Sequence, residues 1–165
     1  MHQTIDINTT IAYMADELRP RLSSNPIMIG VHTGGAWVAE RLHQRLVLPD
    51  PLGTLDISFY RDDFTRVGVN PEVKTSHLPT NIEDRHVILV DDVLHTGRTI
   101  RAALNEIFDY GRPASVTLAV LICRDGRELP IEAQLIGHTL KLKAHEHIKL
   151  TGPQNLQLKI QETTD

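Results

Sequence analysis

The chain has 165 residues, of which 41% are hydrophobic and 23% charged, with a formal net charge of −4 at pH 7. A chain of this length buries roughly 70% of its unfolded surface, so the composition predicts a single globular domain spanning residues 1–165. The acidic balance excludes a generally basic nucleic-acid-binding surface. No apolar run approaches membrane-spanning length, the start of the chain is unlike a secretory signal, and a lone cysteine cannot form an internal disulfide. We therefore expect a cytoplasmic protein with no membrane partner.

The first third of the chain predicts a helix, a buried strand and a second helix. Thr9 or Thr10 can cap the first helix. Residues 27–32 predict the strand, and the turn 33–35 opens the second helix. The apolar positions of the first helix follow the spacing of one helical face: Ile11, Met14, Ala15 and Leu18.

The next segment predicts a strand followed by a long loop. Residues 54–60 nearly alternate between apolar and polar side chains, which indicates a strand. Residues 61–81 are polar, contain Gly68 and Pro71, and show no regular period. Loops of this length inside a compact domain are often lids that exclude water from a reaction. A tolerated surface loop is the alternative interpretation.

The most informative segment is 87–99. A short apolar run, Val87–Val90, is typical of a strand buried in a parallel sheet, and Asp91 and Asp92 follow at its carboxyl end. Residues 96–99 then open a helix, whose first N–H groups and positive dipole end favour an anion. Gly97 permits close approach of a ligand to the backbone. The carboxylates suit ribose hydroxyls and the turn suits a 5′-phosphate, although a plain scaffold turn is the alternative; the P-loop and dinucleotide-binding motifs are absent.

The second half continues the alternation of strands and helices. The helix over 99–110 should end at Gly111 in a left-handed conformation, a third parallel strand covers 115–123, and the tail from 131 should form short strands. This order predicts an α/β fold with a doubly wound, mostly parallel sheet flanked by helices. The expected buried stripe of the helix is Ile100, Ala103, Leu104, Ile107 and Phe108.

Residues 87–99 resemble, position by position, the binding signature for phosphoribosyl pyrophosphate (PRPP) in type I phosphoribosyltransferases. Residues 55–63, 111–113 and 127–131 further resemble the PyrR family of pyrimidine operon attenuation regulators with uracil phosphoribosyltransferase activity. The likeness runs from about Ile5 to Ile160. It implies the type I phosphoribosyltransferase fold, with a lid over about 61–81. It also implies a small hood over the base, formed by about 135–150, including Leu135–His138, and the N-terminal segment.

The resemblance also implies where PRPP would bind. Asp91 and Asp92 are the candidate catalytic residues, and the turn 33–35 would hold the pyrophosphate, although a tight structural turn explains its glycines equally well. The better-known pattern has arginine at Gly34, and its loss removes a charge-assisted bond of roughly 1.5–3 kcal/mol. The base of the lid, Arg61 with Asp62 and Asp63, would organise the pyrophosphate and Mg²⁺. The predicted substrate-binding residues are Thr33, Gly34, Gly35, Arg61, Asp91, Asp92, Val93, Leu94, His95, Thr96, Gly97, Arg98 and Thr99.

The implied cofactor is Mg²⁺ bound through PRPP and not by a protein cage, since His145 and His147 alone do not complete a metal site. The implied partners are PRPP, uracil, UMP or UTP, a pyrimidine leader mRNA and further copies of the chain in a dimer or tetramer. Two alternatives stay open: a non-catalytic, nucleotide-sensing RNA-binding regulator, and a 6-oxopurine (hypoxanthine or guanine) phosphoribosyltransferase. Candidate local RNA contacts are Arg19, Arg21, Arg41, Arg45, Lys141, Lys143 and Lys149.

Overall fold

A computed structural model describes residues 4–57 and 76–163 of the chain. The first half contains α1 (Ile7–Leu18), a 3₁₀ turn η1 (Arg19–Arg21), β1 (Pro26–Val31), α2 (Gly34–Leu46) and β2 (Gly53–Leu55). The second half contains β3 (His86–Leu94), α4 (Arg98–Tyr110), β4 (Ser115–Arg124), β5 (Leu135–Leu140), β6 (Glu146–Thr151) and β7 (Gln157–Glu162). The predicted order of strands and helices is confirmed wherever the structure describes the chain.

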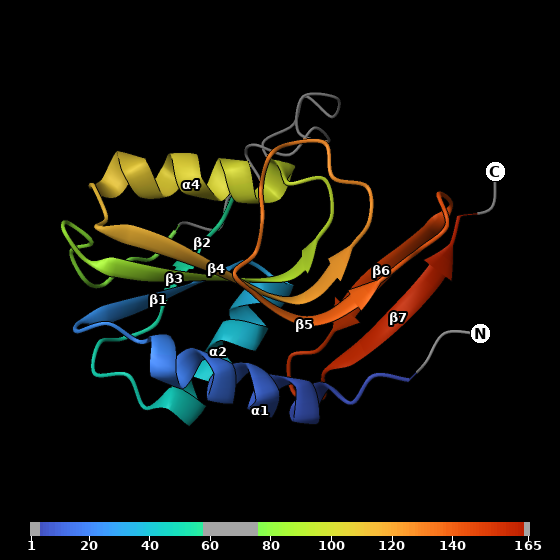
Figure 1. The fold of residues 1–165 in the computed structure, drawn as a ribbon, viewed down its shortest axis with the longest axis horizontal. Coiled ribbons are helices and arrows are strands. Elements are labelled where there is room, and N and C mark those ends of the chain that lie inside the picture. Colours follow the sequence, from blue (N-terminus) through green and yellow to red (C-terminus); the bar gives the residue numbers. More distant parts are fainter. Residues whose placement is uncertain (1–3, 58–75, 164–165) are drawn as a thin grey trace.

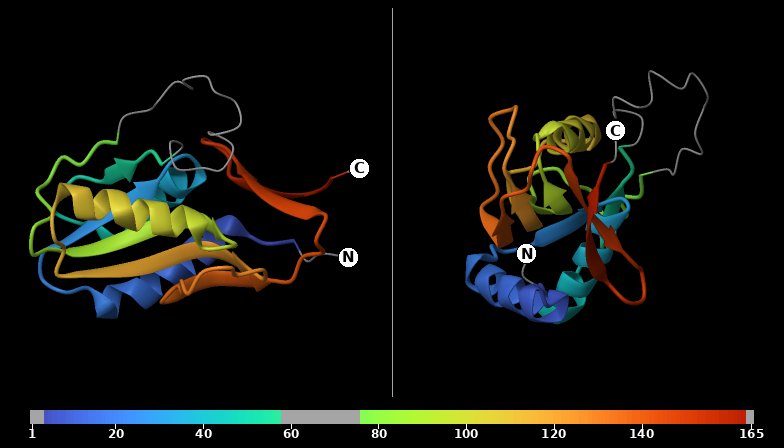
Figure 2. Two further views of the ribbon diagram at one scale, coloured as in Figure 1. Left: turned by 90° about the horizontal axis from the view of Figure 1, so that it is seen from above. Right: turned by 90° about the vertical axis from the view of Figure 1, so that its right-hand side faces the viewer.

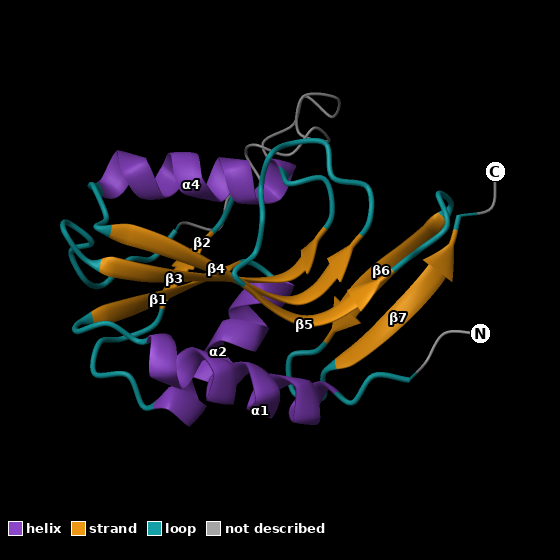
Figure 3. Cartoon of the chain, viewed as in Figure 1, coloured by secondary structure: helices purple, strands orange, loops and turns teal. Residues whose placement is uncertain are grey.

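The main sheet has five parallel strands in the order β2-β1-β3-β4-β5. Helix α4 covers one face and helices α1 and α2 cover the other (Figure 1; Figure 3). The prediction of a doubly wound α/β fold is therefore confirmed. In such sheets ligands bind beyond the carboxyl ends of the strands where the strand order reverses. Here that point lies between β1 and β3.

The core consists of two apolar clusters, one on each face of the sheet. On one face, α1 and α2 bury side chains such as Met14 and Leu42 against the sheet, and on the other α4 buries Ile100 and Ile107. All six residues of β1 are buried, as expected for a strand covered on both faces. The two clusters pack against both faces of β1 and β3, and these strands carry the predicted site at their ends.

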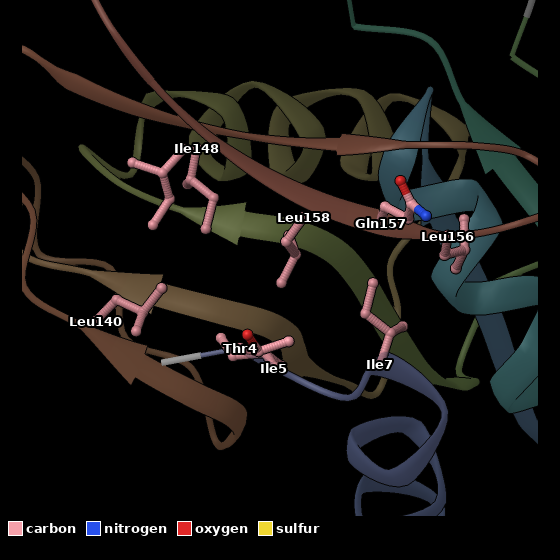
Figure 4. Close-up of a pocket in the computed structure, with 9 residues that line it drawn as sticks. Thr4, Ile5, Ile7, Leu140, Ile148, Leu156, Gln157 and Leu158 are labelled. Carbon is pink, nitrogen blue, oxygen red and sulfur yellow. The ribbon is translucent and has the colours of Figure 1, made fainter. Parts of the chain in front are cut away.

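Strands β6 and β7 form a separate antiparallel pair beyond the carboxyl ends of the main sheet (Figure 2). Its partly buried side chains, including Ile148, Leu158 and Ile160, line a cavity of about 400 Å³ together with Ile5 and Leu140 (Figure 4). The hood was predicted over 135–150, but its first part lies inside the main sheet, because Leu135–His138 belongs to the edge strand β5. Only the chain beyond β5 leaves the sheet.

Two details of the helix ends differ from the prediction. Helix α1 begins before the threonines, because the carboxylate of Asp6 accepts a hydrogen bond from the Thr9 N–H at 3.0 Å and provides the N-cap. Thr10 lies inside the helix, where its hydroxyl donates to the Asp6 carbonyl at 2.8 Å. Gly111 ends α4 in extended backbone, with φ 163°, and not in the left-handed conformation.

The buried stripe of α4 also differs from the prediction at its edge. Phe108 is 56% exposed, whereas Ala102 is buried. At 3.6 residues per turn, Phe108 lies roughly 100° around the helix from the midpoint of Ile100, Ala103 and Ile107, too far to reach the sheet. Among the residues described, no helix is long and apolar enough to cross a membrane.

The strand was predicted over 54–60, but β2 ends at Leu55, and residues 56 and 57 are not part of it. Residues 58–75, which hold most of the predicted lid together with Arg61, Asp62 and Asp63, lie outside the described residues.

Candidate functional site

The two adjacent carboxylates lie within β3, which extends past the apolar run and ends at Leu94. Asp91 is buried, with 4% exposure, and Asp92 is partly buried. The Asp91 carboxylate accepts a hydrogen bond from the Asp92 N–H at 2.8 Å, and the Asp92 carboxylate accepts one from the Val93 N–H at 2.8 Å. These bonds fix the direction of both side chains at the carboxyl edge of the sheet.

The glycine turn at the start of α2 packs directly against these carboxylates. A Cβ atom added to Gly34 would lie 2.2 Å from Oδ2 of Asp92, and one added to Gly35 would lie 2.8 Å from Oδ1 of Asp91. Real Cβ atoms essentially never approach so closely, so both positions need glycine in this conformation. Residues about 57 positions apart in the sequence therefore meet at the point where the strand order reverses.

This contact gives a physical reason for the missing arginine. Any side chain at position 34 would have to displace the Asp92 carboxylate or move the turn. In this chain the Asp92 carboxylate, from β3, fills the space that a side chain at position 34 would need. That space lies next to the turn predicted to bind pyrophosphate.

The turn that opens α4 has the geometry expected of an anion-binding loop. Gly97 has φ +95° and precedes the first helical residue, Arg98. The hydroxyl of Thr96 accepts a hydrogen bond from the Arg98 N–H at 3.1 Å, and the Gly97 carbonyl accepts one from the Arg101 N–H at 2.9 Å. The positive end of the α4 dipole therefore lies beside the turn 96–99, within a few residues of both carboxylates.

His95 lies on the exposed side of this turn. Partial burial of its ring lowers the pKa of His95, and the positive charge of Arg124 lowers it further, while Glu128 and Asp125 act in the opposite direction. The imidazole is therefore less readily protonated than an ordinary histidine side chain. A neutral ring can accept or donate a hydrogen bond, but it contributes no fixed positive charge to the anion-binding turn.

The structure brings together two of the three groups of predicted site residues. The turn 33–35 meets the end of β3, and the chain continues from there through 93–99 into α4. The third group, represented by Arg61, lies outside the described residues. His145 and His147 each have a polar neighbour, Glu162 and Thr163 respectively, and no group of three metal-ligating side chains occurs within residues 4–57 and 76–163.

One part of the site was not predicted. The Thr96 carbonyl accepts hydrogen bonds from the N–H groups of Glu128 and Leu129 at 2.9 and 3.1 Å, and Arg127 donates to the His95 carbonyl. Residues 127–131 stand out in the sequence only through the family resemblance. An arginine and a proline after a buried strand give no signal that they contact a turn some 30 residues earlier.

The chain that leads from the edge strand β5 into β6 is hydrogen-bonded to the carboxyl end of β4. Arg124, which is 6% exposed, donates from Nη1 to the Glu146 carbonyl at 3.0 Å. The Leu142 N–H donates to the Asp125 carboxylate at 3.1 Å, and this bond lowers the pKa of Asp125. These contacts place the start of β6 beside the carboxyl edge of the main sheet, near His95.

Comparison with known proteins agrees with this geometry. Residues 3–151 match the family described as "Phosphoribosyl transferase domain". A hypoxanthine-guanine-xanthine phosphoribosyltransferase superimposes over the whole chain and 96% of its own length with a TM-score of 0.69 at 23% identity. A hypoxanthine phosphoribosyltransferase from Staphylococcus aureus covers 86% of this chain and 78% of its own, with a TM-score of 0.66 at 19% identity. These structures show the fold, and the class that the fold and the site define is the type I phosphoribosyltransferases.

Two relatives narrow the class. The "Bifunctional protein PyrR" of Nitrosococcus oceani is 57% identical over 164 residues, covering 96% of this chain and 93% of the relative. The protein of the same name from Pseudomonas fluorescens is 54% identical over 156 residues, covering 92% and 93%. The chain therefore belongs to the PyrR family. The sequence-based prediction of family, fold and enzyme class is confirmed, and Mg²⁺ with PRPP is the general requirement of phosphoribosyltransferases.

Proposed function

We propose that the whole chain acts as one phosphoribosyltransferase domain that converts uracil and PRPP into UMP and pyrophosphate. In this reaction a bond forms between N1 of uracil and C1′ of the ribose, the bond from C1′ to pyrophosphate breaks, and the proton on N1 is released. The transition state resembles an oxocarbenium ion, with positive charge on the ribose ring. The observation that carries the proposal is the contact of the turn 33–35 with Asp91 and Asp92.

Each group of residues has a role in this scheme. The turn 96–99, with the positive end of the α4 dipole, holds the 5′-phosphate. Asp91 and Asp92 face the ribose hydroxyls and stabilise the developing positive charge. Because Asp91 is buried and both carboxylates accept backbone hydrogen bonds, little reorganisation accompanies the reaction. The turn 33–35 lies beside the leaving pyrophosphate.

The site is suited to a metal that arrives with its substrate. Mg²⁺ favours carboxylate, water and phosphate oxygens, and Asp91 and Asp92 supply the carboxylates at this edge. When bound, Mg²⁺ neutralises charge on the departing pyrophosphate. Two adjacent carboxylates are fewer ligands than a protein cage requires, which supports binding through PRPP.

The base is proposed to lie between the carboxyl edge of the sheet and the chain from β5 to the hairpin. Leu135–His138 themselves begin the edge strand β5 and pair with the middle of β4, so the groups that recognise uracil are expected in the chain that follows β5. The contacts from Arg124 to Glu146 and from Leu142 to Asp125 hold the start of β6 over this edge.

Conversion of labelled uracil into UMP tests the proposal. Purified protein with Mg²⁺ and PRPP should form labelled UMP, and Asp92→Asn should form it far more slowly. Arg112→Ala, at an exposed position after the far end of α4, is a control that should leave the rate unchanged. A wild-type protein that binds PRPP but forms no UMP would contradict the enzymatic assignment and leave a nucleotide-sensing regulator in its place.

A second function, binding of a pyrimidine leader mRNA under control of UMP or UTP, is favoured by one observation on the hairpin. Lys149 of β6 lies directly opposite Lys159 of β7, and both are exposed. Like charges in this arrangement destabilise a sheet, so a polyanion would relieve the repulsion. We propose that this face contacts RNA. A gel shift with and without UMP over a salt series tests it: Lys149→Gln with Lys159→Gln should weaken binding and flatten the salt dependence.

A further inference from the structure

The turn that binds the 5′-phosphate in our proposal is held from outside by the chain that follows β4. Residues 126–131, which we call the buttress, contact His95 and the first three residues of the turn 96–99. The Thr96 carbonyl accepts two hydrogen bonds from the buttress backbone, at 2.9 Å from the Glu128 N–H and 3.1 Å from the Leu129 N–H. Both bonds come from consecutive amide groups, so the carbonyl of Thr96 is fixed in direction.

Packing and charge reinforce these hydrogen bonds. A Cβ atom added to Gly97 would lie 3.1 Å from Cβ of Ile131, so the buttress covers the turn closely. One added to Gly126 would lie 2.9 Å from Nε2 of His95. The carboxylate of Glu128 lies 3.4 Å from Nε of Arg98, although this pair is about half exposed and contributes little.

Arg127 makes the most specific contact. Its Nη1 donates to the His95 carbonyl and its Nη2 donates to Sγ of Cys123 at 3.1 Å. Cys123 belongs to β4 and is buried, so it does not move easily. The guanidinium therefore connects a buried strand of the core to the residue that precedes the turn 96–99. A planar group with several donors in fixed directions is suited to bridge two acceptors in this way.

We infer that Arg127 is a positioning residue for phosphoribosyl transfer: by bridging Cys123 and the His95 carbonyl, it holds the start of the turn 96–99 in the conformation that binds the 5′-phosphate. This inference rests on the proposed function and extends it to a residue with no predicted role. Arg127 acts through the backbone of the turn, so its loss should affect ligands with a 5′-phosphate and spare those without one.

The test compares the binding of UMP and of uridine by calorimetry. Wild-type protein should bind UMP more tightly than uridine, because only UMP uses the turn. Arg127→Ala should weaken UMP binding by about 10- to 100-fold, the range for loss of a hydrogen bond to a charged group. Uridine binding should change by less than about threefold, or about 0.7 kcal/mol, because uridine has no 5′-phosphate and makes no contact with the turn. In the enzyme assay, KM for PRPP should rise while kcat is largely kept.

Control variants separate this role from general destabilisation. Arg112→Ala removes an exposed arginine that follows the far end of α4 and should leave both affinities unchanged. If Arg127→Ala does not fold, Arg127→Lys decides, because one ammonium group cannot reproduce the planar bridge and UMP binding should still weaken by at least about threefold.

Two outcomes would overturn the inference in distinguishable ways. If the wild-type protein discriminates UMP from uridine and the folded Arg127 variants discriminate equally well, the positioning role is wrong and the proposed function stands. If the wild-type protein binds UMP and uridine equally, the turn does not bind the 5′-phosphate, and the proposed function fails with the inference.

Discussion

Replacement of Gly34 by alanine tests the meeting of the two halves of the site. In the structure, the new Cβ atom would lie 2.2 Å from Oδ2 and 2.8 Å from Cγ of Asp92. Ordinary van der Waals contact begins near 3.4 Å, so the carboxylate or the turn must move by about 1.2 Å, the difference between 3.4 and 2.2 Å. Asp92 cannot move freely, since its other oxygen accepts the Val93 N–H at 2.8 Å.

Both activity and stability should respond. A displacement of about 1 Å at a reacting centre can lower the rate by about 100-fold, and one extra methyl group in a closely packed region costs about 1–3 kcal/mol of stability. We expect Gly34→Ala to lower kcat for UMP formation by about 100-fold while losing no more than about 3 kcal/mol in urea unfolding.

Gly53→Ala is the matched control for crowding. There the nearest atom is Cδ2 of Leu78 at 3.0 Å, the end of a flexible side chain remote from the carboxylates. This variant should keep its activity even if it loses some stability. Wild-type activity in Gly34→Ala, or an equal loss in both variants, would refute the reasoning that Gly34 makes room for Asp92.

Three further predictions concern single side chains. Asp92→Asn should lower turnover at least about 100-fold, because the developing positive charge loses its partner, and a rate near that of the wild type would remove Asp92 from the catalytic assignment. Asp6→Ala should cost about 1 kcal/mol in urea unfolding through loss of the α1 cap, with no change in activity, and an unchanged midpoint would contradict the cap. The native pKa of His95 is lowered, so the unfolded chain binds more protons as pH falls past about 6.5, and part of the stability is lost there. His95→Gln should therefore show a smaller stability loss between about pH 7.5 and about pH 5.5 than the wild type, and an identical loss would argue against the shift.

The sequence was most informative where local chemistry and topology agree. The run 87–99 combines an apolar strand, two carboxylates and a helix start. Together these three parts leave few possible interpretations of the segment. The parallel sheet then follows from the alternation of elements, and its carboxyl edge places the turn 33–35 near Asp91. The fold class could therefore be predicted from the sequence, and so could the meeting of the turn 33–35 with the end of β3.

Features that depend on exact packing could not be predicted. The threonines after Asp6 are equally good caps by residue type, and only the backbone direction selects the aspartate. From the sequence, glycine at position 34 indicates only that a charged partner for pyrophosphate is missing. The structure adds that the Asp92 carboxylate fills the space of a side chain there. The bridge from Arg127 to the His95 carbonyl depends on the path of a loop with no periodic pattern.

The most direct test of the account is release of pyrophosphate by the purified protein given Mg²⁺ and PRPP with uracil, hypoxanthine, guanine and xanthine in turn. The account predicts release with uracil and none above background with the three purines. Release with a purine but not with uracil would contradict the proposed substrate while keeping the PRPP site. No release with any base, from a protein that still binds UMP, would contradict the proposed catalysis itself.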